Sequence, residues 1–98
     1  MTITELWIQH TNTKFPSDFG GKDVNGVCVT SVDSYASGCI SSFVNKESGS
    51  LDIERFQILQ KCEKELEKVL PFVENEAFEY FSRLYSMCGI VISEAKIA

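Results

Sequence analysis

The chain has 98 residues, of which 44% are hydrophobic and 23% are charged, as expected for a single globular domain with its own apolar core. Nine basic and fourteen acidic residues give a net charge of −5, and no cluster of Lys or Arg is present that could neutralise nucleic-acid phosphates. The N-terminus lacks the pattern of a secretory signal, and the longest mostly apolar run, 84–92, is about half of a membrane span. We therefore expect a cytoplasmic protein of one domain, 1–98, that binds neither nucleic acid nor membrane.

The first third of the chain predicts a small β element. Residues 3–9 (ITELWIQ) alternate between two faces, which favours a short strand. Residues 10–23 are rich in Asn, Pro, Gly, Ser and Asp and predict a loop that Phe15 and Phe19 fasten to the core. Asn25-Gly26 then lies between two β-prone runs in 22–30, a strong signal for a hairpin with a type I′ turn. The strand at 3–9 could join this hairpin.

The next segment, SYASGCISSFV, is rich in serine, yet its apolar residues have helical spacing. They fall at 32, 35, 36, 39, 40, 43 and 44, so Tyr35 is expected on the buried face of a helix over about 32–46. Ser31 or Asp33 could cap its start. A loop at 45–50 follows.

Two further helices have clear apolar faces. One begins at Asp52 and ends before Pro71, because proline cannot continue a helix. The other begins near Asn75 and buries residues from Phe78 to Ala95, with Glu79 and Arg83 spaced for a helical ion pair. The predicted fold is mainly α (small α+β): a β element and loop in 1–31, and a three-helix bundle in 32–98.

Four cysteines invite a metal or redox interpretation. Their spacing lacks the close pairs of zinc sites, and the only histidine, His10, is distant from them in sequence and falls in the predicted loop. Cys39, Cys62 and Cys88 each lie on the predicted apolar face of a different helix, which favours a role in core packing. Because all three cysteines lie on apolar helix faces, packing of the helices could bring the three thiols together. A redox or metal-responsive role therefore stays an alternative.

No catalytic constellation emerges from the sequence. A nucleophilic Cys39 would need a base, and His10 is the sole imidazole. The glutamates fall on predicted solvated faces, and FGGKD (19–23) lacks the spacing of a phosphate-binding loop. We expect no catalytic residue, metal or cofactor, although an enzyme with a pocket between hairpin and bundle stays open.

The outer side of the 32–46 helix is the most unusual surface in the sequence, because it carries small residues where a solvated helix carries Lys and Glu. They are Ser34, Ser37, Gly38, Ser41 and Ser42. Uncharged helix faces tend to be buried, so another part of the monomer or a partner could cover this face, or it could be exposed.

A second candidate contact surface surrounds the start of the chain, where Trp7 and Phe15 lie close in sequence to His10 and Phe19. Aromatic residues beside loops are enriched at interfaces, and they also anchor loops to small cores. Our candidate partner-binding residues are Ser34, Ser37, Gly38, Ser41, Trp7 and Phe15.

These observations favour a small non-enzymatic interaction or regulatory protein that acts by docking to a protein partner or by homodimerisation. A thiol-based redox or metal-responsive protein is the first alternative. An acidic inhibitor or immunity-type protein that neutralises a basic enzyme is the second, motivated by size and charge.

Overall fold

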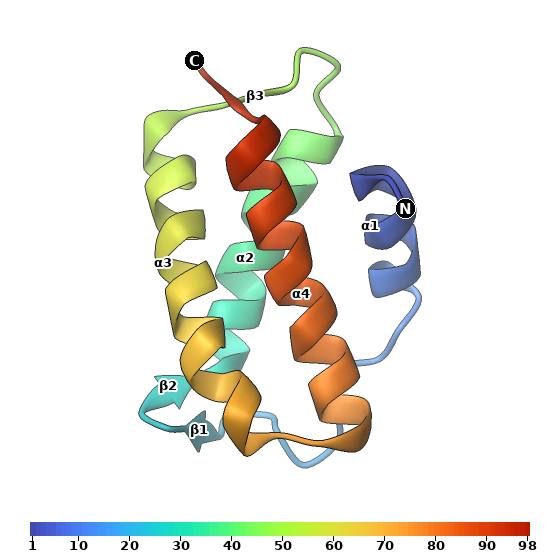
Figure 1. The fold of residues 1–98 in the computed structure, drawn as a ribbon, viewed down its shortest axis with the longest axis vertical. Coiled ribbons are helices and arrows are strands. Elements are labelled where there is room, and N and C mark those ends of the chain that lie inside the picture. The colour runs from blue at the N-terminus through green and yellow to red at the C-terminus, as the bar shows by residue number, and fades with distance from the viewer.

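The computed structural model describes all residues, Met1–Ala98, and consists of four helices and two short strand pairs (Figure 1). The elements in chain order are α1 (Ile3–Thr11), β1 (Asp23–Val24), β2 (Val27–Cys28), α2 (Val29–Val44), β3 (Ser50–Leu51), α3 (Ile53–Val69), the 3-10 turn η1 (Leu70–Phe72), α4 (Asn75–Glu94) and β4 (Lys96–Ile97). The predicted class, mainly α with a small β component, is confirmed.

The core lies between α2, α3 and α4, which pack on one another along most of their lengths (Figure 1). Twenty buried apolar residues form a single cluster, which includes the completely buried Phe81, Ile40, Leu59 and Leu84. Helices with one apolar stripe pack in this way because only mutual contact removes all three stripes from water. None of the helices combines the length and the hydrophobicity that crossing a bilayer requires.

The strand predicted at 3–9 is wrong, because these residues form α1, a fourth helix. Thr2 and Glu5 make a capping box: the Glu5 amide donates to Thr2 Oγ1 (3.2 Å) and the Thr2 amide donates to Glu5 Oε1 (2.9 Å). The cap stabilises the helical start, and Ile3, Leu6 and Trp7 then face the bundle at helical spacing. His10 consequently lies in the last turn of α1 and is buried, not in a loop.

The hairpin predicted around Asn25-Gly26 is confirmed. Both residues have positive φ, 49° and 79°, as a type I′ turn requires, and Val24 pairs with Val27. The Asn25 side chain donates to the carbonyl of Lys68 (3.1 Å), which attaches the hairpin to the end of α3. The sheet holds only these two strands.

A second strand pair was not predicted. β3 and β4 run parallel, with the Lys96 amide donating to the Gly49 carbonyl (2.9 Å) and the Ala98 amide to the Leu51 carbonyl (3.1 Å). These bonds fix the segment after α4 against the loop between α2 and α3. Helix α4 therefore ends at Glu94.

Three details of the helices also differ from expectation. Helix α2 begins at Val29, so Cys28 is its N-cap, and neither Ser31 nor Asp33 caps it. Tyr35, expected inside, is 62% exposed, and Phe78 is 44% exposed. Both lie at the edge of an apolar stripe, where helical spacing alone does not determine which side faces the neighbouring helix.

Candidate functional site

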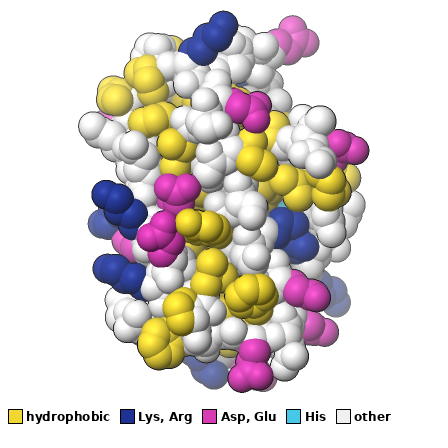
Figure 2. Space-filling view, viewed as in Figure 1, with side chains coloured by type: hydrophobic (Ala, Val, Ile, Leu, Met, Phe, Trp, Pro, Cys, Tyr) yellow, Lys and Arg dark blue, Asp and Glu magenta, His cyan; other side chains and the backbone are white.

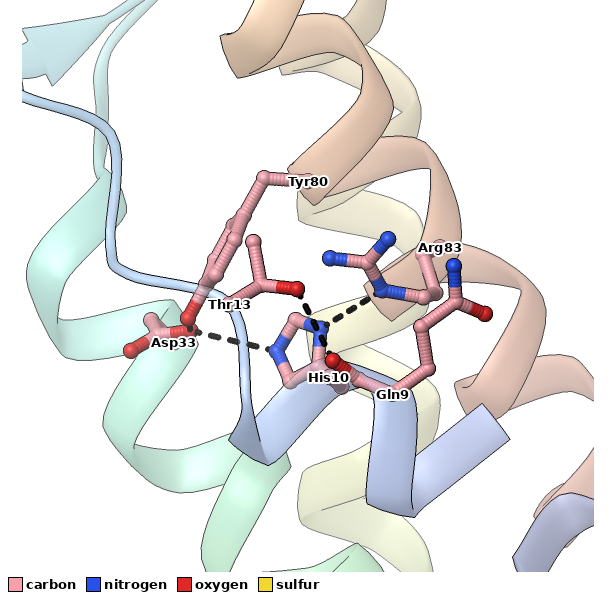
Figure 3. Close-up of polar contacts among 6 residues, drawn as sticks. All are labelled: Gln9, His10, Thr13, Asp33, Tyr80 and Arg83. Atoms are coloured by element: carbon pink, nitrogen blue, oxygen red, sulfur yellow. Dashed lines mark hydrogen bonds and ion pairs between the residues drawn. The ribbon is translucent and has the colours of Figure 1, made fainter. Parts of the chain in front are cut away.

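The strongest polar constellation joins α1, α2 and α4 around His10. Figure 3 shows the imidazole between Asp33 of α2 and Arg83 of α4, with the Tyr80 ring alongside. Arg83 Nε donates to His10 Nδ1 (3.2 Å), and the ring centroids of His10 and Tyr80 lie 4.4 Å apart. Because Nδ1 accepts this bond, the imidazole is neutral and carries its proton on Nε2.

The acidic member of the network is engaged by Tyr80 instead of the histidine. Tyr80 donates its hydroxyl proton to Asp33 Oδ1 (2.6 Å), while His10 Nε2 lies 4.0 Å from the same oxygen and has no hydrogen-bond partner. The contact is therefore too long for a hydrogen bond, and a neutral imidazole makes no ion pair there.

The pKa values of the network follow from its burial. Burial, and then the Arg83 charge, lowers the pKa of His10 to about 4. Burial raises the pKa of the Asp33 carboxyl, and the hydrogen bond from Tyr80 partly opposes this. Burial, followed by the bond to Asp33, raises the pKa of Tyr80 well above its usual value. At neutral pH the site holds a neutral histidine, so its basicity is too low for an effective general base.

Arg83 does not form the ion pair predicted with Glu79. The three contacts within ion-pair distance are His10–Asp33, Asp52–Arg55 and Lys61–Glu65. The guanidinium turns instead toward the bundle, where it contacts the imidazole and lies 6.0 Å from the centre of the Tyr80 ring. Its Nη2 atom is buried without a hydrogen-bond partner.

The cysteines divide into two kinds. Cys39, Cys62 and Cys88 belong to the apolar core, as their helical phase indicated, and burial raises the pKa of each, that of Cys62 to about 11. Cys28 is half-buried, and a hydrogen bond from the Ser31 hydroxyl (3.3 Å) lowers its pKa. No group of three or more His, Cys, Asp or Glu side chains is arranged to hold a metal ion.

A groove follows the outer seam between α2 and α3, and we call it the α2/α3 groove. Two adjoining pockets of about 470 and 320 Å³ form it, and Tyr35 and Ile58 line both. A side chain built at Gly38 would meet nothing within 4 Å at its Cβ, so the helix leaves this part of the groove open. The charged groups along the groove are Glu54, Arg55, Lys61 and Glu65.

The structure distributes the six predicted partner-binding residues over two regions. Ser34 and Gly38 line the α2/α3 groove, whereas Ser37 and Ser41 are half-buried and lie outside it. Trp7 and Phe15 do not line the groove. The Trp7 ring lies 6.4 Å from His10, and that of Phe15 packs edge-on against Tyr80 (5.5 Å) and Phe81 (5.9 Å).

Sequence reasoning missed the apolar part of the groove. Tyr35 was expected in the core, and Ile58 was not considered, although it lies at the edge of the buried stripe of α3. An apolar residue at this edge, beside Glu54 and Lys61, was the available signal. Figure 2 shows that hydrophobic side chains also reach the surface over α3, α4 and the turn between them, where Phe72 is 66% exposed.

The chain matches no protein-family model, no curated protein and no solved structure.

Proposed function

We propose that this chain is a non-enzymatic protein that acts through homotypic association, with a second copy docked in the α2/α3 groove. The observation that carries the proposal is the open groove at Gly38 beside Tyr35, an aromatic residue that is 62% exposed. Exposed aromatic side chains are enriched among the residues that anchor protein interfaces, where they fill a pocket of the partner.

Self-complementarity favours a second copy as the partner. In a two-fold dimer each patch meets its own copy, so a side chain that projects from one chain fills a pocket of the other. Tyr35 projects beside a pocket of about 320 Å³ that Gly38 leaves unfilled. Two such chains, related by a two-fold axis near Tyr35, would exchange their tyrosines and shield both Ile58 side chains from water.

The charges along the groove also suit a second copy. The chain carries a net charge of −5, which disfavours contact between most parts of its surface and the same parts of another copy. The groove itself is lined by two acids, Glu54 and Glu65, and two bases, Arg55 and Lys61. Arg55 and Lys61 contact Asp52 and Glu65 of their own chain, so the groove would repel a second copy less than an evenly acidic surface would.

Sedimentation equilibrium over a wide concentration range tests the proposal. We expect a reversible dimer for the wild type, and dissociation constants at least about tenfold higher for Tyr35→Ser and Gly38→Leu. Gly38→Leu fills the pocket while placing a good helix former at an open position. The matched control is Phe72→Ser, which removes an aromatic residue of similar exposure outside the groove.

A wild type that stays monomeric throughout the range would overturn the proposal. Equal weakening by Tyr35→Ser and Phe72→Ser would place the interface elsewhere. Circular dichroism of each variant shows whether a loss of association reflects the groove or a loss of folding.

A further inference from the structure

We propose that a separate pocket beside the start of α4 binds a small zwitterion of the amino-acid class. The pocket has a volume of about 510 Å³ and lies between the loop at 12–17 and the first three turns of α4. This volume is within the range of small-ligand sites. Eight of its ten lining residues are not hydrophobic, so its ligand must be polar.

The first argument is the state of Arg83, which lines this pocket. Its side chain is half-buried and is held by two neutral partners, the imidazole of His10 and the ring of Tyr80. Figure 3 shows the guanidinium held against the imidazole. Charges that lose hydration are normally paired with an opposite charge. Here no carboxylate of the protein lies within ion-pair distance of the cation, and its Nη2 atom is buried without a partner, so a ligand carboxylate against the part of Arg83 that lines the pocket would supply the missing countercharge.

The second argument is the distribution of charge around the pocket. Lys14 adds a second cation from the loop, and Glu76 and Glu79 add two carboxylates from α4. None of these four charged residues takes part in an ion pair of the protein. Along the helix axis, Glu79 precedes Arg83 by about 6 Å, at about 1.5 Å per residue. Acidic and basic groups therefore occupy successive turns of α4, which forms one wall of the pocket.

This arrangement selects the chemical class of the ligand. A simple anion would be attracted by Arg83 and Lys14 but repelled by the two glutamates, and a simple amine would meet the opposite conflict. A molecule with a carboxylate and an ammonium group a few bonds apart satisfies both. Phe15 and Tyr80 supply apolar contact for the rest of the ligand.

The test is a titration of the full chain with each proteinogenic amino acid at millimolar concentration, followed by NMR of the backbone amides. We expect saturable shifts at residues 12–17 and 76–83 for at least one amino acid. The N-acetyl and carboxamide derivatives of that amino acid should each bind at least about fivefold more weakly, because each lacks one of the two charges.

Matched variants connect the binding to the pocket. Lys14→Gln and Glu79→Gln should weaken binding by a similar factor, while Lys46→Gln and Glu47→Gln, exposed in the loop after α2, should leave it unchanged. The proposal is overturned if no amino acid produces saturable shifts in the pocket, or if Lys14→Gln and Glu79→Gln bind like the wild type. An N-acetyl derivative that binds equally well would reduce the site to one for anions and overturn the zwitterion assignment.

Discussion

Helix α1 and the other three helices are attached to the fold by different interactions. Helices α2, α3 and α4 share most of the twenty apolar core residues, whereas the only buried side chain of α1 is the imidazole of His10. Apolar burial is insensitive to pH, but a buried neutral imidazole stabilises a fold only while it stays neutral. The same small protein therefore combines a pH-independent core with a pH-dependent attachment of its first helix.

The largest effect should come from the core. Phe81 is completely buried, so Phe81→Ala should lower the free energy of unfolding by about 3–5 kcal/mol, measured by urea denaturation. Leu6→Ala, at a half-buried position of α1, should cost less than half as much. Equal losses would show that α1 is as integral to the fold as α4.

The second-largest effect should come from acidification, which weakens the packing of α1 on the bundle. The pKa of His10 is about 4 in the fold and 6.5 without it, so the unfolded state binds more protons between these values. The contribution of neutral His10 to the free energy of unfolding is thus fully present above pH 6.5. It decreases by up to about 3 kcal/mol as the pH falls toward 4. The raised pKa of Asp33 acts in the opposite direction near the acidic end of this range.

Urea denaturation at a series of pH values measures this loss. His10→Gln keeps an acceptor for Arg83 but does not titrate, so its stability should change less over this range. A wild type with the same pH profile as the variant would contradict the role of His10.

Gly38 should give a smaller effect of the opposite sign. It lies inside α2, and nothing within 4 Å would meet its Cβ. Gly38→Ala should therefore raise the free energy of unfolding by about 0.5–1 kcal/mol, because glycine is a poor helix former. Thermal denaturation measures this gain. An unchanged or lower midpoint would show that the position is more crowded than its surroundings indicate.

Thiol labelling distinguishes the half-buried cysteine from the three buried ones without changing stability. Cys28 is half-buried with a lowered pKa, whereas Cys39, Cys62 and Cys88 are buried with raised pKa values. The Cys28 thiol should therefore react at least about a hundredfold faster than the other three. Labelling of those three should require global unfolding. Mass spectrometry identifies the labelled cysteine. Rapid labelling of Cys62 in the native protein would instead favour the redox alternative.

The predictable parts of the fold were those with one consistent signal. The last two helices have apolar stripes repeated over four or more turns, and Asn25-Gly26 specifies its own turn. Residues 3–9 satisfied two periods at once, since seven residues are too few to separate alternation from helical spacing. The Thr2–Glu5 capping box was the signal that favoured a helix.

The candidate sites were less predictable because they depend on contacts between distant segments. His10 and Arg83 are 73 residues apart, and Asp33 and Tyr80 are 47 apart. Local spacing even predicted the wrong partner for Arg83, since it favoured Glu79. Ser34 and Gly38 were proposed from helical phase and small side chains, but the Tyr35 side of the groove depends on where α3 packs.

The hairpin turn also bears on the chemical lifetime of the protein. Asparagine before glycine is prone to deamidation, because the unhindered glycine amide can attack the side-chain amide carbon and release ammonia. At Asn25 that side chain is held by the carbonyl of Lys68, in the last turn of α3. Hydrolysis of the cyclic product to aspartate would replace this donor with a negative charge at the negative end of the helix dipole. Ageing at this one residue would therefore remove the hydrogen bond between the hairpin and the end of α3.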